Sequence, residues 1–155
     1  MFIWPVRIYY EDTDCGGVVY YANYLKYMER ARSEWLRGLG FEQDVLMERY
    51  GIVFAVQSAQ LQFLRPGRFN DLLYVGTAEM RRGRASLTFA QSVVRAAGEA
   101  EARAFLESPR APVLRGEAGA EPLCKGVIKV ACLTTPGMRP SRIPREIATE
   151  LRREH

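Results

Sequence analysis

The sequence is almost free of histidine. Among 155 residues the single histidine is the last one, His155. A Ser-His-Asp or Cys-His catalytic site needs an imidazole held in place, and chain termini are seldom held. The three cysteines, Cys15, Cys124 and Cys132, form no Cys-x-x-Cys pair, so zinc sites built from Cys and His lack their ligands. We therefore expect no zinc site of this kind, and any acid–base chemistry must come from carboxylates.

Long apolar runs are also missing. The longest such stretch, 127–133, is interrupted by Lys129 and is far shorter than the roughly 20 residues that a bilayer requires. The first residues have neither the basic start nor the apolar segment of a secretion signal. An odd number of scattered cysteines is typical of a reducing compartment. We expect a cytoplasmic protein.

Neither sign of charge strongly dominates the composition. The 22 Lys and Arg exceed the 18 Asp and Glu by a net charge of +4, which suits an anionic small ligand, a nucleic acid or a solvated basic surface. No RNA-binding motif is present and the arginines are dispersed, so we do not expect a nucleic acid partner. With 48% hydrophobic and 26% charged residues, the chain is predicted to form one globular domain, 1–155.

The strongest periodic signal lies between Tyr24 and Leu39. Apolar residues recur there at steps of three and four, with charged residues between them, which predicts a long helix to about Arg37. Gly38 and Gly40 offer a C-terminal stop. A weaker helix is expected over 41–50, and a short charged helix over about 145–153.

Elsewhere the apolar period is close to two. It predicts strands over 3–10, 52–64, 72–80, 85–96 and 125–134.

Two segments fit this pattern poorly. Residues 99–105 suit either a strand extension or a helical turn, and 106–122, rich in proline and glycine, is predicted as a surface-loop insertion. The chain is thus expected to be α+β, with one long helix packed on an antiparallel sheet. One helix leaves a sheet face and the sheet edges uncovered, so we expect at least a homodimer.

The candidate site precedes the long helix. Three acids, Glu11, Asp12 and Asp14, share a loop with Gly16 and Gly17, which let the backbone approach a ligand closely. The free N–H groups of a helix start favour developing negative charge. A carboxylate beside such donors is the minimum for acyl-group hydrolysis. The same residue types are also ordinary turn formers and helix caps.

This region resembles the YbgC-like branch of the hydroxybenzoyl-CoA thioesterase family. The matching segments are VRIYYEDTD at 6–14, GGVVY at 16–20, NYLKYMERAR at 23–32 and MRPSRIP at 138–144. The resemblance implies a hotdog fold, in which a curved antiparallel sheet wraps a long central helix. It also implies a homodimer or homotetramer with sites at subunit interfaces, and hydrolysis of acyl-CoA thioesters without metal or cofactor.

Individual roles follow from the same resemblance. The catalytic aspartate corresponds to Asp14, Gly16 and Gly17 belong to the oxyanion loop, and the amide that polarises the thioester carbonyl belongs to Tyr21. The branch usually has histidine at the position of Tyr21, whereas the hydroxybenzoyl-CoA enzyme resembles this chain in having tyrosine. Asp14 is expected either to attack the carbonyl or to activate a water. Of Glu11 and Asp12, we expect one to bond the backbone and the other to face solvent.

Arg81, Arg82 and Arg84 lie in a predicted turn between two strands. Guanidinium groups pair well with phosphate oxygens, so these residues are candidates to bind coenzyme A, and family members use basic residues in this region. A solvated hairpin turn is an equally good interpretation. Cys15 adjoins Asp14, but with no imidazole to lower its pKa we do not expect it to be the nucleophile.

A second hypothesis assigns no catalysis. The chain would then be an acyl-CoA-binding or scaffold protein associated with the Tol-Pal cell-envelope system, with a peripheral link to membrane-envelope proteins, as the resemblance permits. The presence of Asp14, Gly16 and Gly17 argues against an inactive site.

Overall fold

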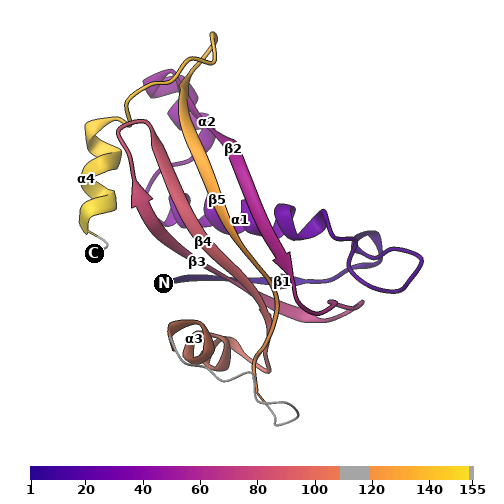
Figure 1. The fold of residues 1–155 in the computed structure, drawn as a ribbon. Coiled ribbons are helices and arrows are strands. Elements are labelled where there is room, and N and C mark those ends of the chain that lie inside the picture. Colours follow the sequence, from indigo (N-terminus) through magenta and orange to yellow (C-terminus); the bar gives the residue numbers. More distant parts are fainter. Residues whose placement is uncertain (109–118, 154–155) are drawn as a thin grey trace.

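The computed structural model describes residues 1–108 and 119–153. In this part of the chain, one five-stranded sheet carries helices on both faces (Figure 1). The elements in chain order are β1 (Phe2–Arg7), the 3-10 turn η1 (Tyr10–Asp12), α1 (Asn23–Gly38), α2 (Gln43–Tyr50), β2 (Ile52–Phe63), β3 (Leu72–Arg82), β4 (Ser86–Arg95), α3 (Glu99–Glu107), β5 (Glu121–Thr134) and α4 (Arg145–Arg153).

The sheet is antiparallel throughout and has the order β1-β3-β4-β5-β2. The strands β1 and β2 are therefore its edges, and α1 and α2 carry the chain from one edge to the other. Three irregularities interrupt the ladders, at Gln57 in β2, at Met80 in β3 and at Leu123 in β5. Bulges bend a strand and increase its twist, which helps the sheet curve around α1.

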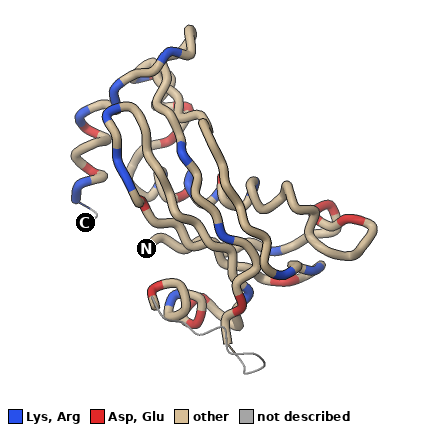
Figure 2. The backbone as a smooth tube through the Cα atoms, in the orientation of Figure 1, with Lys and Arg blue, Asp and Glu red and all other residues tan. Residues whose placement is uncertain are grey.

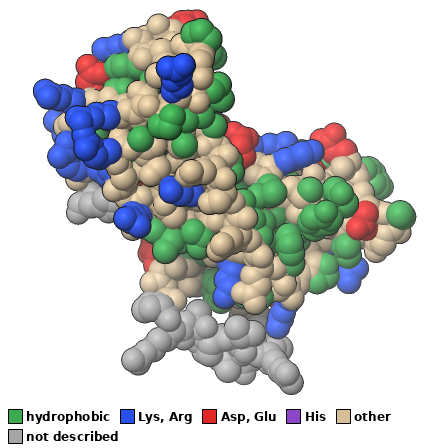
Figure 3. Space-filling view, turned by 45° about the horizontal axis from the view of Figure 1, so that its top comes forward, with side chains coloured by type: hydrophobic (Ala, Val, Ile, Leu, Met, Phe, Trp, Pro, Cys, Tyr) green, Lys and Arg blue, Asp and Glu red, His purple; other side chains and the backbone are tan. Residues whose placement is uncertain are grey.

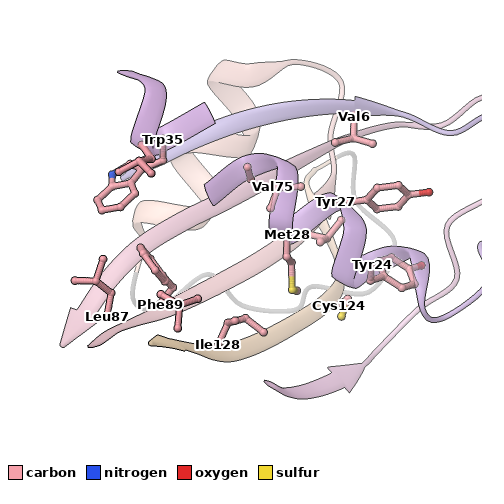
Figure 4. Packing of buried hydrophobic residues seen from close by; sticks show 14 of the residues in the cluster. Val6, Tyr24, Tyr27, Met28, Trp35, Val75, Leu87, Phe89, Cys124 and Ile128 are labelled. Atoms are coloured by element: carbon pink, nitrogen blue, oxygen red, sulfur yellow. The ribbon is translucent and has the colours of Figure 1, made fainter. Parts of the chain in front are cut away.

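The core lies between α1 and the concave face of the sheet. Tyr27, Met28 and Ala31 are fully buried on one stripe of the helix. Figure 4 shows Met28 and Trp35 on the side of α1 that faces Phe89 and Ile128 of the sheet. The rings of Trp35 and Phe89 meet edge to face, with centroids 5.1 Å apart. The predicted long helix and its apolar stripe are thus confirmed.

The helix ends with a Schellman motif at Gly40. The N–H of Gly40 donates to the carbonyl of Arg37 over 2.9 Å, and the N–H of Phe41 donates to that of Leu36 over 3.1 Å. Gly40 has φ +89°, in the left-handed region that favours glycine. The two glycines that the sequence suggested as a stop therefore differ, because Gly38 is the last helical residue.

A second, smaller core lies on the opposite face of the sheet. Here α3 packs Ala102 against Ile3, Tyr74 and Val94. Residues 99–105, for which the sequence allowed either structure, are therefore helical. The helix covers part of the sheet face that one helix alone would leave exposed.

Most predicted boundaries hold within two residues, and three differ more. The strand predicted over 3–10 ends at Arg7, because the chain turns at 10–12. The last strand begins at Glu121, four residues before its predicted start at 125. The predicted insertion over 106–122 begins inside α3 and ends inside β5, and residues 109–118 of it lie outside the described residues. In the described ranges, no helix is long and apolar enough to cross a bilayer.

Phe89→Ala tests the core between α1 and the sheet. Phe89 is 2% exposed, so we expect its loss to lower the free energy of unfolding by about 3–5 kcal/mol. The matched control is Met80→Ala at an exposed position of β3, which should change the free energy by about 0.5 kcal/mol or less. Urea unfolding followed by circular dichroism measures both. Equal effects of the two changes would contradict the placement of Phe89 in the core.

Candidate active site

The acid-bearing loop between η1 and α1 folds back on itself. Thr13 pairs with Val19 in an isolated antiparallel bridge, and the N–H of Asp14 donates to the carbonyl of Val18 over 2.9 Å. The turn closes through the N–H of Gly17, which donates to the carbonyl of Asp14 over 3.0 Å. Gly17 has φ +73°, so a side chain there would be strained. The loop thus presents Asp14 from a short, hydrogen-bonded hairpin.

One oxygen of the Asp14 carboxylate is held by the backbone. Its Oδ1 accepts a hydrogen bond from the N–H of Gly16 over 2.8 Å, and the residue is exposed. A Cβ at position 16 would lie 3.0 Å from the same Oδ1, so a side chain there would crowd the carboxylate. In the part of the chain that the structure describes, no Lys or Arg forms an ion pair with Asp14. The carboxylate is therefore oriented but still available to a ligand.

The start of α1 supplies hydrogen-bond donors. The side chain of Asn23, which is 5% exposed, donates through Nδ2 to the carbonyl of Asp12 over 2.9 Å. The N–H groups of the first helical residues donate to the carbonyls of Tyr20, Tyr21 and Ala22. Within residues 1–108 and 119–153, the N–H groups of Tyr21 and Ala22 have no acceptor. Such unpaired donors at a helix start are suited to an oxyanion.

A second loop, between β2 and β3, supports the first. The N–H of Val19 donates to the carbonyl of Gly67 over 2.9 Å, and the N–H of Gly67 donates to Oη of Tyr24 over 3.0 Å. A Cβ on Gly67 would lie 3.0 Å from Cγ2 of Val19, so only glycine fits between these groups without displacement. Burial raises the pKa of Tyr24, and the hydrogen bond from Gly67 opposes the rise.

The second loop is itself held by an ion-pair network. Arg95 contacts Asp71 over 2.6 Å and also pairs with Glu121, which pairs in turn with Arg65. The guanidinium groups of Arg65 and then Arg95 lower the pKa of the Glu121 carboxyl, against the effect of its burial. The network joins β4 and β5 to both ends of the loop.

The acids Glu11 and Asp12 separate as expected. Asp12 is 8% exposed, and its Oδ2 accepts a hydrogen bond from the N–H of Tyr9 over 2.8 Å. Glu11 faces solvent. Burial raises the pKa of the neighbouring Tyr27, and the negative charge of Asp12 adds to the rise. Asp12 is thus part of the scaffold of the loop.

Aromatic side chains surround the site on the surface. The ring of Tyr21 lies 4.9 Å from that of Tyr20 and 5.9 Å from that of Phe63, while Tyr10 stacks on Phe69 at 4.1 Å. Hydrophobic side chains are visible over this part of the surface, on the right of Figure 3. Sequence reasoning did not connect Phe63 and Phe69 with the site. In the sequence, Phe63 and Phe69 lie on either side of the Arg65-Pro66-Gly67 turn. This position alone does not place them near the site, because only the tertiary fold brings the turn to Val19.

The structure does not bring the three predicted coenzyme A arginines to Asp14. They lie at the hairpin between β3 and β4, at the opposite end of the sheet from the acid-bearing loop (Figures 1 and 2). Arg82 pairs with Glu79 over 2.8 Å and donates to the carbonyl of Leu151 over 2.8 Å, so it holds the end of α4. Among the described residues, the side chains of Arg81 and Arg84 make no hydrogen bond or ion pair.

A cavity of about 110 Å³ lies between α1 and the sheet. Its apolar lining includes Leu36, Phe54, Val56 and Leu87, and Arg32 also faces it. Neither Asp14 nor Tyr21 lines this cavity. The carboxylate and the apolar space are therefore separate within one chain.

Fold and site together define a class. A curved antiparallel sheet wrapped around one long helix, with a carboxylate and free amides at the helix start, is the hotdog arrangement that the sequence resemblance implied. The thioesterase superfamily model matches residues 16–102. The chain belongs to the thioesterase superfamily, and the predicted family and fold are confirmed.

Individual relatives agree with this assignment. The chain is 35% identical over 146 residues to the acyl-CoA thioesterase YbgC of Haemophilus influenzae, covering 94% of this chain and 90% of the relative. It is 34% identical over 152 residues to the acyl-CoA thioester hydrolase YbgC of Escherichia coli, covering 98% and 96%. The crystal structure of a 1,4-dihydroxy-2-naphthoyl-CoA thioesterase from Synechocystis superposes with a TM-score of 0.77 at 17% identity, covering 99% and 98% of the two chains, which shows the shared fold.

The three thiols should differ sharply in reactivity. Cys15 is exposed in the site loop, whereas burial raises the pKa of Cys124 to about 12 and that of Cys132 to about 11. We expect dithionitrobenzoate to modify one thiol rapidly at neutral pH in the native protein, and three in denaturant. Cys15→Ala should remove the rapid phase. A rapid phase that survives this substitution would contradict the burial of the other two.

Proposed function

We propose that the protein is an acyl-CoA thioesterase in which Asp14 is the catalytic carboxylate and the N–H of Tyr21 is an oxyanion donor. One observation carries these roles. The loop that fixes Asp14 through Gly16 closes against the start of α1, where the amides of Tyr21 and Ala22 have no acceptor in the described chain. Membership of the superfamily supports the reaction class.

The chemistry follows from these groups. The thioester carbonyl oxygen accepts hydrogen bonds from the free amides, which stabilise the negative charge that develops on it. Asp14 either attacks the carbonyl carbon to form a mixed anhydride, which water then hydrolyses to release the acid and restore the carboxylate, or removes a proton from a water that attacks the carbonyl carbon directly. In both routes the C–S bond breaks and coenzyme A leaves as a thiolate. A thiolate is a good leaving group, so the site functions without histidine.

We further propose that the active enzyme is at least a homodimer formed through β2. This strand is an open edge of the sheet, and residues 56–60 along it are exposed. A second copy can pair with it antiparallel about a two-fold axis. Such pairing places the end of one β2, at Phe63, beside the start of the other, at Phe54.

This arrangement would make the site composite. Phe63 contacts Tyr21 and Tyr24 at the helix start, while Phe54 and Val56 line the 110 Å³ cavity. The pairing would therefore set the Asp14 end of one chain against the cavity of the other. The separation of carboxylate and cavity within one chain supports this proposal.

The same geometry bears on coenzyme A binding. Ser86 at the start of β4 pairs with Ala131 of β5, and Ala131 pairs with Ala55 near the start of β2. The β3–β4 hairpin therefore lies at the same end of the sheet as the start of β2. The two-fold axis would bring Arg81 and Arg84 of one chain to the end that holds Asp14 of its partner. We propose that these two arginines contact the phosphates, Arg84 from a hollow of about 400 Å³ that Arg142 and Arg145 also line.

A cytoplasmic location is proposed from the thiols, all three of which are free. The alternative of a non-catalytic acyl-CoA-binding or scaffold protein of the Tol-Pal system is not favoured by the relatives, which are named as thioesterases and thioester hydrolases. A peripheral link to envelope proteins remains a prediction.

Asp14→Asn is the direct test of catalysis. We expect kcat/KM to fall by about a hundredfold or more, because the amide neither attacks the carbonyl nor accepts a proton. Release of free thiol from a panel of acyl-CoAs measures the rate. Glu11→Gln, at an exposed acid of the same loop, is the matched control and should stay within about twofold. Full activity of Asp14→Asn would refute the assignment, and a panel with no turnover by the unsubstituted protein would favour the binding hypothesis.

Ala59→Lys tests the proposed dimer. Ala59 is exposed in the middle of β2, and a lysine there opposes pairing of two edges. We expect the mass measured by light scattering to fall to that of one chain, and the activity to fall by about tenfold or more if the site is composite. Thr149→Lys on the exposed face of α4 is the control. A monomeric variant with full activity would show that one chain suffices.

A further inference from the structure

The 110 Å³ cavity between α1 and the sheet is apolar except for a few side chains, and Arg32 is the cation among them. Arg32 is partly buried, and desolvation lowers the pKa of its guanidinium, opposed by the charge of Glu29. An apolar space of roughly 150 Å³ holds one benzene ring, so this cavity of about 110 Å³ has room for the far end of a short acyl chain and not for a ring.

A buried amide fixes the guanidinium in this position. Nη1 of Arg32 donates to Oε1 of Gln91 over 2.7 Å. Gln91 is 2% exposed, and its Nε2 donates to Oγ1 of Thr77 over 2.8 Å and to the carbonyl of Met28 over 2.9 Å. Both amide hydrogens of Gln91 are therefore used, so its oxygen must face Arg32. The Arg32 guanidinium is therefore held by the neutral side chain of Gln91, a residue of β4.

In the described chain only the charge of Glu29 acts on that of Arg32. No carboxylate forms an ion pair with it. Glu29 also lines the cavity, but it is exposed, and its Oε1 accepts a hydrogen bond from Oγ of Ser33 over 2.7 Å. A guanidinium carries five N–H donors, and the bond to Gln91 uses one.

We propose that Arg32 binds a carboxylate at the far end of the acyl group, so that the enzyme prefers short acyl-CoAs that carry a terminal carboxylate. A carboxylate satisfies two guanidinium donors at once and neutralises a charge that is costly to bury alone. The apolar walls, including Leu36, Phe54 and Leu87, then contact the methylene groups between the two ends.

The inference rests on the proposed function, because the scissile thioester must reach Asp14. The proposed pairing of β2 sets the cavity of one chain beside the Asp14 loop of its partner. The acyl group would then run from the free amides of one chain to Arg32 of the other. Glu29 is exposed, so water screens its repulsion of the ligand.

The experiment compares substrates of equal shape. Glutaryl-CoA and adipoyl-CoA are measured against acyl-CoAs in which an isopropyl group replaces the terminal carboxylate. Hydrogen bonds to charged groups predict that kcat/KM favours the carboxylate by about tenfold to a hundredfold. In Arg32→Met this ratio should fall to about one, and in Arg32→Lys it should be intermediate, because lysine keeps the charge but not the two-pronged geometry. Arg30→Met, at an exposed arginine of the same helix, should keep the full ratio.

A ratio near one in the unsubstituted enzyme would overturn the inference, as would equal losses for both substrates in Arg32→Met. Calorimetric titration with free glutarate separates the two proposals. Glutarate binding that Arg32→Met abolishes supports the carboxylate site even if no acyl-CoA is hydrolysed, in which case the proposed function alone has failed. Hydrolysis of the panel without glutarate binding and without preference for the carboxylate refutes the site and leaves the proposed function intact.

Discussion

The geometry of the site depends on one buried amide, that of Asn23 at the first position of α1. Its Nδ2 bonds the carbonyl of Asp12, which also accepts the N–H of Tyr20, so the acid-bearing loop and the helix start share an anchor. Because Asn23 is shielded from water, loss of this bond would leave its side-chain amide unsatisfied at a cost of about 1–3 kcal/mol. Between this anchor and the helix, the N–H groups of Tyr21 and Ala22 donate to no acceptor in the described chain. The proposed oxyanion donors are thus a consequence of how the helix begins.

The second loop shows how a weakly buried site is kept rigid. Asp14 is exposed, and local contacts hold only one of its oxygens. The loop between β2 and β3 supports the Asp14 loop. Gly67 lies between Val19 and Tyr24, and the ion-pair network of Arg65, Glu121, Arg95 and Asp71 ties the supporting loop to the sheet. Partly exposed ion pairs contribute little to stability individually, but a network limits where a loop can move. The site therefore combines an accessible carboxylate with a backbone that has little freedom.

Sequence reasoning found those features whose cause is local. The stripe from Tyr24 to Trp35 and the alternation along the strands depend on neighbouring residues, and the loop with Asp14 is read from adjacent positions. The start of the last strand was missed because Pro122 suggests a break, whereas it sits beside an irregularity in the ladder with β4. The helix at 99–107 is stabilised by Ile3 and Tyr74, which are distant in sequence. The contacts of Arg32, Gly67 and Phe63 escaped notice for the same reason, because their partners are distant in sequence. Arg82 has a partner three residues away, Glu79, that the bulge at Met80 brings into reach.

The bulge at Gln57 also affects which strands can pair with the edge strand β2. An open edge strand has unpaired backbone N–H and C=O groups that can pair with any extended peptide. A long, flat edge therefore promotes aggregation. Because Gln57 introduces a bend, a straight strand laid along β2 would lose contact on one side of it. A strand with the same bend would keep contact along its length. In the proposed pairing of two β2 strands, the irregularity would favour a copy with the same bend over unrelated strands.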